Sequence, residues 1–180
     1  MAPKTPVRLV IDASVACTAG EFNVIDPASK NCREFLLVIR KTKHLMVLTP
    51  AIVDEWNKHA SLFATTWRVS MRNRRQVCDV RLAEQIDLVR AILDTARPGG
   101  CLAIMQKDMH LILAALATDQ TVVALDDHAR EQFRFAAFTV SAVACVVWVN
   151  PGNVEEELTK WLAAGAKPEA KRRLGHMEGP

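Results

Sequence analysis

Short runs of apolar, mostly β-branched residues alternate with longer segments of helical periodicity along this chain of 180 residues. The runs are predicted to be buried strands, and they cover residues 7–12, 44–48, 121–125 and 143–149. Each run is continuously apolar rather than alternating, which is typical of strands that are covered on both faces. The order of elements therefore predicts an α/β fold with a parallel sheet between two layers of helices.

Helical periodicity and capping residues locate the intervening helices. They are expected over residues 27–41, from residue 50 onward, and over 66–96, 108–118, 127–135 and 155–164. The segment 66–96 is longer than most globular helices, and a break near Asn73 would fit its pattern. Residues 1–165 are expected to form one domain. The basic segment 166–180 has little to bury and is expected to be a mobile tail.

Composition indicates the cellular compartment and the class of protein to expect. Half of the residues are hydrophobic, so one domain can bury a core without disulfides. The five cysteines form no C-x-x-C pair, and the first residues lack the apolar core of a secretory signal, so a cytoplasmic protein is expected. The longest apolar stretch, residues 135–149, is too short to span a bilayer, so no membrane association is expected.

Four carboxylates are predicted to meet at one edge of the sheet. Asp12 and Asp126 follow the first and third predicted strands, and ligands of open parallel sheets bind at the carboxyl ends of the strands. The predicted helix after Asp108 and the strand before Asp126 run about 15 Å in opposite directions, which returns Asp108 to the same edge. Glu55 lies about one turn into the helix that follows the second strand.

Each of these acids also has an ordinary structural interpretation. Asp12 fits a turn, Asp108 fits an N-cap, and Glu55 fits a solvated helix face. Converging carboxylates, however, repel one another and raise one another's pKa unless cations neutralise them. Oxygen ligands without cysteine or paired histidine select hard ions, so the four acids together predict a site for Mg²⁺ or Mn²⁺.

Four short motifs carry these acids. They are Val10-Ile-Asp-Ala-Ser14, Thr49-Pro-Ala-Ile-Val-Asp-Glu-Trp56, residues 107–117, and Val122-Val-Ala-Leu-Asp-Asp-His128. As an ordered set they resemble the motifs of the PIN-domain (PIN-like) ribonuclease family. Ala124 departs from the family pattern, because many members have a hydroxyl residue there. The doubled acid Asp126-Asp127 leaves the fourth ligand ambiguous by one residue.

This resemblance implies a Rossmann-like three-layer α/β/α sandwich with a central parallel sheet of four to five strands, in which residues 1–165 form the nuclease domain. It implies a metal-dependent endoribonuclease that hydrolyses RNA phosphodiester bonds, either the toxin of a toxin–antitoxin pair or an RNA-processing nuclease. RNA, an antitoxin protein and a second copy in a homodimer are the implied partners, and Mg²⁺ or Mn²⁺ is the implied cofactor. The implied catalytic and metal-binding residues are Asp12, Glu55, Asp108 and Asp126, with Ser14 and Asp127 as accessory residues.

Basic residues near the middle of the chain offer a contact for RNA. Arg68, Arg72 and Arg75 recur at helical spacing beside Trp67, a combination typical of proteins that pair with phosphates and stack on bases. A solvated basic helix face explains the same pattern. His110 and His128 each follow a proposed ligand by two positions, where each fits either a substrate contact or a surface histidine.

Two alternatives to a nuclease are considered. A catalytically silent PIN-fold module that binds RNA or protein is disfavoured, because such modules usually lack some of the four acids. A phosphotransfer protein of the haloacid-dehalogenase type needs a second aspartate two residues after Asp12, where Ser14 stands. A receiver-type protein needs a phosphorylated aspartate on a central strand and a lysine at the end of a later strand, and neither is evident.

Overall fold

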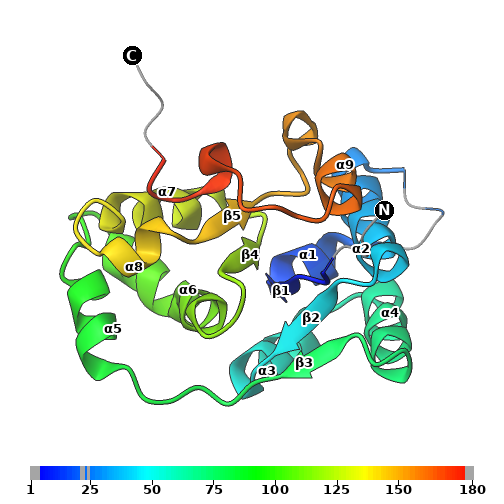
Figure 1. Ribbon diagram of the computed structural model, residues 1–180, viewed down its shortest axis with the longest axis horizontal. Helices are drawn as coiled ribbons and strands as arrows, with labels where there is room; N and C mark the ends of the chain where they lie inside the picture. The colour runs from blue at the N-terminus through cyan, green and yellow to red at the C-terminus, as the bar shows by residue number, and fades with distance from the viewer. Residues whose placement is uncertain (1–4, 21–22, 24, 177–180) are drawn as a thin grey trace.

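A parallel sheet of five strands forms the centre of the protein in the computed structural model, which describes residues 5–20, 23 and 25–176. The strand order is β3-β2-β1-β4-β5, and each neighbouring pair is parallel. The strands are β1 (Arg8–Ile11), β2 (Leu45–Leu48), β3 (Val77–Asp79), β4 (Thr121–Val123) and β5 (Val147–Val149). The expected fold is confirmed: the protein is a three-layer, Rossmann-like α/β/α sandwich (Figure 1).

Helices form the two outer layers. They are α1 (Ala13–Thr18), α2 (Pro27–Thr42), α3 (Pro50–His59), α4 (Leu62–Asn73), α5 (Ile86–Leu93), α6 (Cys101–Leu116), α7 (Asp127–Ala136), α8 (Ser141–Ala144) and α9 (Leu158–Ala163), with the 3₁₀ turns η1 (Val154–Glu156) and η2 (Ala170–Arg172). In Figure 1, α2, α4 and α9 lie on one side of the sheet, and α5 to α8 lie on the other. Asp26 and Thr49 cap α2 and α3, and each is followed by a proline, which suits the first helical position.

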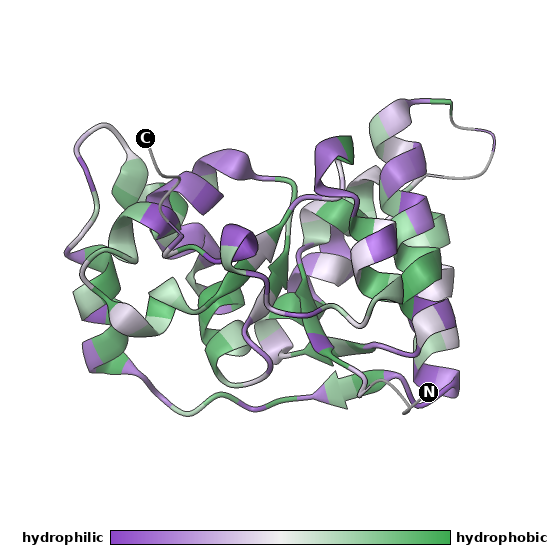
Figure 2. Cartoon of the chain, turned by 45° about the horizontal axis from the view of Figure 1, so that its top comes forward, coloured by the Kyte–Doolittle hydropathy of each residue, from purple (hydrophilic) through white to green (hydrophobic). Residues whose placement is uncertain are grey.

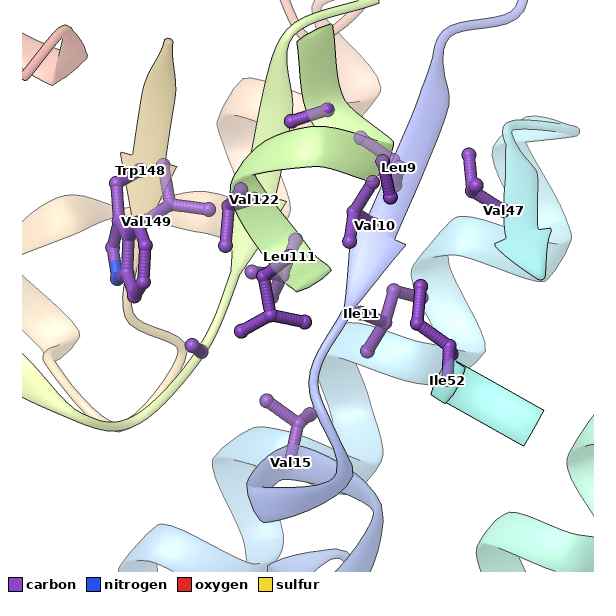
Figure 3. Close-up of a cluster of buried hydrophobic side chains, with 14 of the residues drawn as sticks. Leu9, Val10, Ile11, Val15, Val47, Ile52, Leu111, Val122, Trp148 and Val149 are labelled. Carbon is purple, nitrogen blue, oxygen red and sulfur yellow. The ribbon is translucent and has the colours of Figure 1, made fainter. Parts of the chain in front are cut away.

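The core fills the space between the sheet and the helices. Figure 3 shows Val10 and Ile11 of β1 near Leu111 of α6 and Ile52 of α3, and all four are at most 1% exposed. Figure 2 shows hydrophobic residues along the strands and on the inward faces of the helices, with hydrophilic residues outside. Burial on both faces explains why the central strands are continuously apolar in sequence.

Residues 66–96 do not form one long helix, so that expectation is wrong. The chain completes α4 at Asn73, turns at Arg75 with a φ of 58°, forms β3, and enters α5 only at Ile86. The predicted break near Asn73 is confirmed, but it precedes a strand that was not predicted. Two further bounds differ: α6 begins at Cys101 rather than Asp108, and the run over 143–149 contains the end of α8 before β5.

The C-terminal segment packs against the sheet over residues 166–176, so the expectation of a mobile tail is wrong there. Ala166 and Leu174 are each 2% exposed, and the backbone N–H of Leu174 donates to the carbonyl of Val146 at 2.8 Å. Arg173 forms an isolated antiparallel bridge with Val147 of β5. The segment has apolar residues to bury after all; residues 177–180 lie outside the described part of the chain. None of the helices that the structure describes is long and apolar enough to cross a membrane.

Candidate active site

The direction of strand progression reverses between β1 and β4, which are neighbours in the sheet. Ligands of open α/β sheets bind outside the carboxyl ends of the strands at such a switch point. Asp12 directly follows β1, and Asp126 follows β4 after two intervening residues. The hydroxyl of Ser14 accepts a hydrogen bond from the backbone N–H of Leu125 at 3.2 Å, which ties the two loops together. Asp12 and Asp126 are therefore held at the same edge of the sheet.

Both of these acids cap helices. Asp12 Oδ2 accepts from the N–H of Ser14 at 3.0 Å at the start of α1, and Asp126 Oδ1 accepts from the N–H of Ala129 at 2.9 Å at the start of α7. Capping uses one carboxylate oxygen and fixes the orientation of the side chain. No other described residue donates a hydrogen bond to either carboxylate, so each retains an oxygen that a ligand can use.

Asp108 lies in the middle of α6, where it has no capping role. Asp108 is 4% exposed. Its pKa is raised to about 6, chiefly by burial and further by the negative charges of Asp12 and Asp126. Lys107 opposes this shift, but its Nζ lies 3.9 Å from Asp108 Oδ1, too far for a hydrogen bond. The charges of Asp12 and Asp126, which follow two separate strands, therefore reach Asp108 on α6.

Glu55 lies outside this group of three. Its carboxylate on α3 pairs with Lys58 Nζ at 3.1 Å and with His59 Nε2 at 3.5 Å, and the hydrogen bond from Lys58 is the main cause of its lowered pKa. His110 on α6 lies close enough to lower the pKa of both Glu55 and Asp108. The structure thus places the charges of Asp12 and Asp126 near Asp108, whereas the carboxylate of Glu55 pairs with Lys58 and His59.

Asp127 is bound to other partners. Its Oδ2 accepts from Asn150 Nδ2 at 2.8 Å, and its Oδ1 lies 3.7 Å from Nη1 of Arg130. Asn150 is 6% exposed directly after β5, and its Nδ2 also lies 3.2 Å from the carbonyl of Leu125, which supports the loop that carries Asp126. The predicted motifs do not reveal Asn150, although a polar residue at the end of an apolar strand is a usable signal. His128 is exposed.

The three predicted RNA-binding arginines do not share one helix. Arg68 and Arg72 lie on α4, whereas Arg75 follows the end of this helix in a left-handed conformation. The argument from helical spacing is therefore wrong for Arg75. Arg72 is neutralised by Asp79 through two hydrogen bonds, one of them 2.9 Å long. Arg68 donates instead to the side-chain oxygen of Asn57 at 2.7 Å.

The donor atoms of Asp12, Asp108 and Asp126 are all carboxylate oxygens, which suit a hard divalent cation such as Mg²⁺ or Mn²⁺. Within the described part of the chain, no three His, Cys, Asp or Glu side chains are already close enough together to hold a metal ion. Comparisons with protein-family models, with curated proteins and with solved structures give no match. The resemblance to PIN-domain ribonucleases thus rests on the four motifs and their order.

Proposed function

We propose that this protein is a metal-dependent endoribonuclease that hydrolyses RNA phosphodiester bonds. The observation that carries the proposal is the burial of the Asp108 carboxylate within helix α6. Its pKa is raised to about 6 by this burial and by the charges of Asp12 and Asp126. Burial of a carboxylate beside two others costs free energy and contributes nothing to packing that an apolar residue would not. Such an arrangement favours a site that binds a cation or substrate over a purely structural role.

Asp12, Asp108 and Asp126 would hold Mg²⁺ or Mn²⁺ between them, since their oxygens offer the ligand chemistry that these ions prefer. A divalent cation bound there supplies an activated water and offsets charge on the scissile phosphate. The capping hydrogen bonds hold Asp12 and Asp126 in position, and burial shields Asp108 from water. Because these acids are not preassembled at ligand distance, binding requires their side chains to close toward one another.

The surroundings of the three acids suit an anionic substrate. Lys107 places a cationic side chain beside Asp108, and His110 lies on the same helix; both can contact a phosphate of the RNA. The hydroxyl of Ser14 lies between the Asp12 and Asp126 loops and has a proton to donate to a phosphate oxygen. Glu55, whose pKa is lowered in part by the charge of His110, is proposed to act from outside the group.

Two biological roles share this chemistry. One is the toxin of a toxin–antitoxin pair, which would have an antitoxin protein as a partner, and the other is an RNA-processing nuclease. In both proposed roles the protein would act on RNA in the cytoplasm. A homodimer fits either role.

Cleavage of a mixed-sequence RNA tests the proposal. Wild-type protein should cleave with Mg²⁺ or Mn²⁺ and stop in EDTA. Asp12→Asn should lower the cleavage rate by about 100-fold or more, since the cation contributes several kcal/mol to the transition state, while asparagine still caps α1. The matched control is Asp26→Asn, because Asp26 caps α2 through the same kind of hydrogen bond, 2.8 Å from the N–H of Ser29. Full cleavage in EDTA, or normal cleavage by a folded Asp12→Asn protein, would overturn the proposal.

A further inference from the structure

A groove with a volume of about 380 Å³ opens between α3 and α4 at the end of β2. One part of its lining is apolar and comes from Leu48, Val53 and Val69. The other part is polar and comes from Asn57, Arg68, Arg72 and Asn73. The groove therefore offers an apolar surface next to two guanidinium groups.

Arg68 carries a positive charge that no described carboxylate neutralises. Its Nη2 donates to the neutral side-chain oxygen of Asn57 at 2.7 Å, and its guanidinium carbon lies 5.8 Å from the centre of the Trp56 ring. Its Nη1 is shielded from water and meets no hydrogen-bond acceptor among the described residues. A buried guanidinium nitrogen without an acceptor costs free energy, so the described residues do not fully satisfy Arg68.

Arg72 differs from Arg68 in this respect. Asp79 neutralises it through both oxygens, so its charge is already balanced in the free protein. The unbalanced charge of the groove is thus concentrated at Arg68. A ligand that complements the groove must present acceptors to Arg68 and an apolar face to the opposite lining.

We infer that this groove binds a guanine base of single-stranded RNA, with Arg68 as the residue that selects it. The apolar lining suits the face of a base, whereas a phosphate would gain nothing from it. Guanine presents two adjacent acceptors, O6 and N7, which match the forked donors of arginine. Adenine and cytosine place an amino donor on the corresponding edge, where it would oppose the guanidinium.

The helix α3 connects the groove to the proposed active site. Val53 and Asn57 of α3 line the groove, and α3 packs against α6, the helix that carries Asp108. The inference places a base in the groove and a phosphate at the carboxylates on the same RNA strand. The inference rests on the proposed RNA substrate, but it does not depend on cleavage.

Binding of short labelled RNAs in EDTA tests the inference separately from catalysis. The probes are a uridine-rich strand with one guanine and the same strand with adenine or 7-deazaguanine at that position, the last of which lacks the N7 acceptor. Wild-type protein should bind the guanine strand about tenfold more tightly than the other two. Arg68→Met should remove this preference, and Arg68→Lys, which keeps the charge but not the fork, should remove it as well. Arg74→Met is the matched control, because Arg74 is exposed and does not line the groove.

Two results would overturn the inference. An equal loss of affinity for all three strands in Arg68→Met would make Arg68 a phosphate contact, and unchanged binding of all three would exclude the groove from RNA binding. Failure of the proposed function has a different signature: the guanine preference would be present in EDTA, but the bound RNA would stay intact after Mn²⁺ is added. That outcome would support the guanine site and contradict the nuclease.

Discussion

The ionisation of Asp108 opposes folding. Its pKa of about 6 in the folded protein lies above the ordinary value of 3.8, because the charged form is buried beside Asp12 and Asp126. Between these two values the folded chain binds more protons than the unfolded chain. Stability therefore falls as the pH rises through this window and stays lower above it. A divalent cation at the site would offset this loss, because it stabilises the ionised carboxylates.

Replacement of this carboxylate should stabilise the metal-free protein. Asp108→Asn is expected to raise the free energy of unfolding at pH 7 by about 1–3 kcal/mol, since one pKa unit corresponds to about 1.4 kcal/mol and the new amide recovers part of the cost of burial. The variant should also lose most of the stability change between about pH 4 and pH 6. Urea unfolding at several pH values measures both effects, with the exposed Asp54→Asn on α3 as the control. If Asp108→Asn is no more stable than the wild-type protein at pH 7, the ionised Asp108 carboxylate does not destabilise the fold.

Among the elements, burial decided what the sequence could predict. The strands β1, β2, β4 and β5 were predictable because their residues are almost all buried, which leaves continuous apolar runs. The edge strand β3 has three residues and ends in an exposed aspartate, and its valine continues the apolar spacing of the helix before it. The start of α6 was hidden for a different reason: Gly100 at its N-cap has a φ of 90° and makes no side-chain capping bond.

The candidate site was predictable to the extent that it depends on strand ends. Asp12 and Asp126 follow buried strands, and the lengths of the connecting elements returned Asp108 to them. The position of Glu55 depends on competition within its own helix, where Lys58 and His59 pair with its carboxylate. The role of Asn150 depends on which strand lies next to β4, which a single sequence does not contain.

The C-terminal segment depends on one close approach to α8. A Cβ atom on Gly175 would lie 2.6 Å from the Cβ of Ala144 and 3.0 Å from its backbone, so Gly175→Ala must displace either the segment or the helix. This substitution is expected to lower the free energy of unfolding by about 1–3 kcal/mol, as overpacking typically does.

Urea unfolding measures this change, and a second substitution provides the control. Ala144→Gly in the Gly175→Ala background removes the side-chain contact and should restore part of the stability, although the backbone contacts persist. Wild-type stability of the Gly175→Ala protein would show that Gly175 is not held against Ala144 of α8.

At the scale of the whole molecule, topology brings together acids that are far apart in the chain. The connection from β3 to β4 crosses the sheet through α5 and α6, and α6 packs on both β1 and β4. This crossover places Asp108 beside two strand ends that already carry Asp12 and Asp126. The doubly wound strand order thus brings the three acids of the proposed cation site to one edge of the sheet.

Binding of Mn²⁺ to the protein without RNA, measured by isothermal titration calorimetry near pH 7, tests this site most directly. Wild-type protein should bind Mn²⁺, and Asp108→Asn and Asp126→Asn should each weaken binding by at least about tenfold, since even indirect contacts to a metal commonly have effects of that size. Asp127→Asn should bind like wild type, because this neighbouring carboxylate is bound to Asn150 and Arg130 instead. Absence of Mn²⁺ binding in wild-type protein, or equal affinity in Asp108→Asn, would contradict a cation site formed by these three acids.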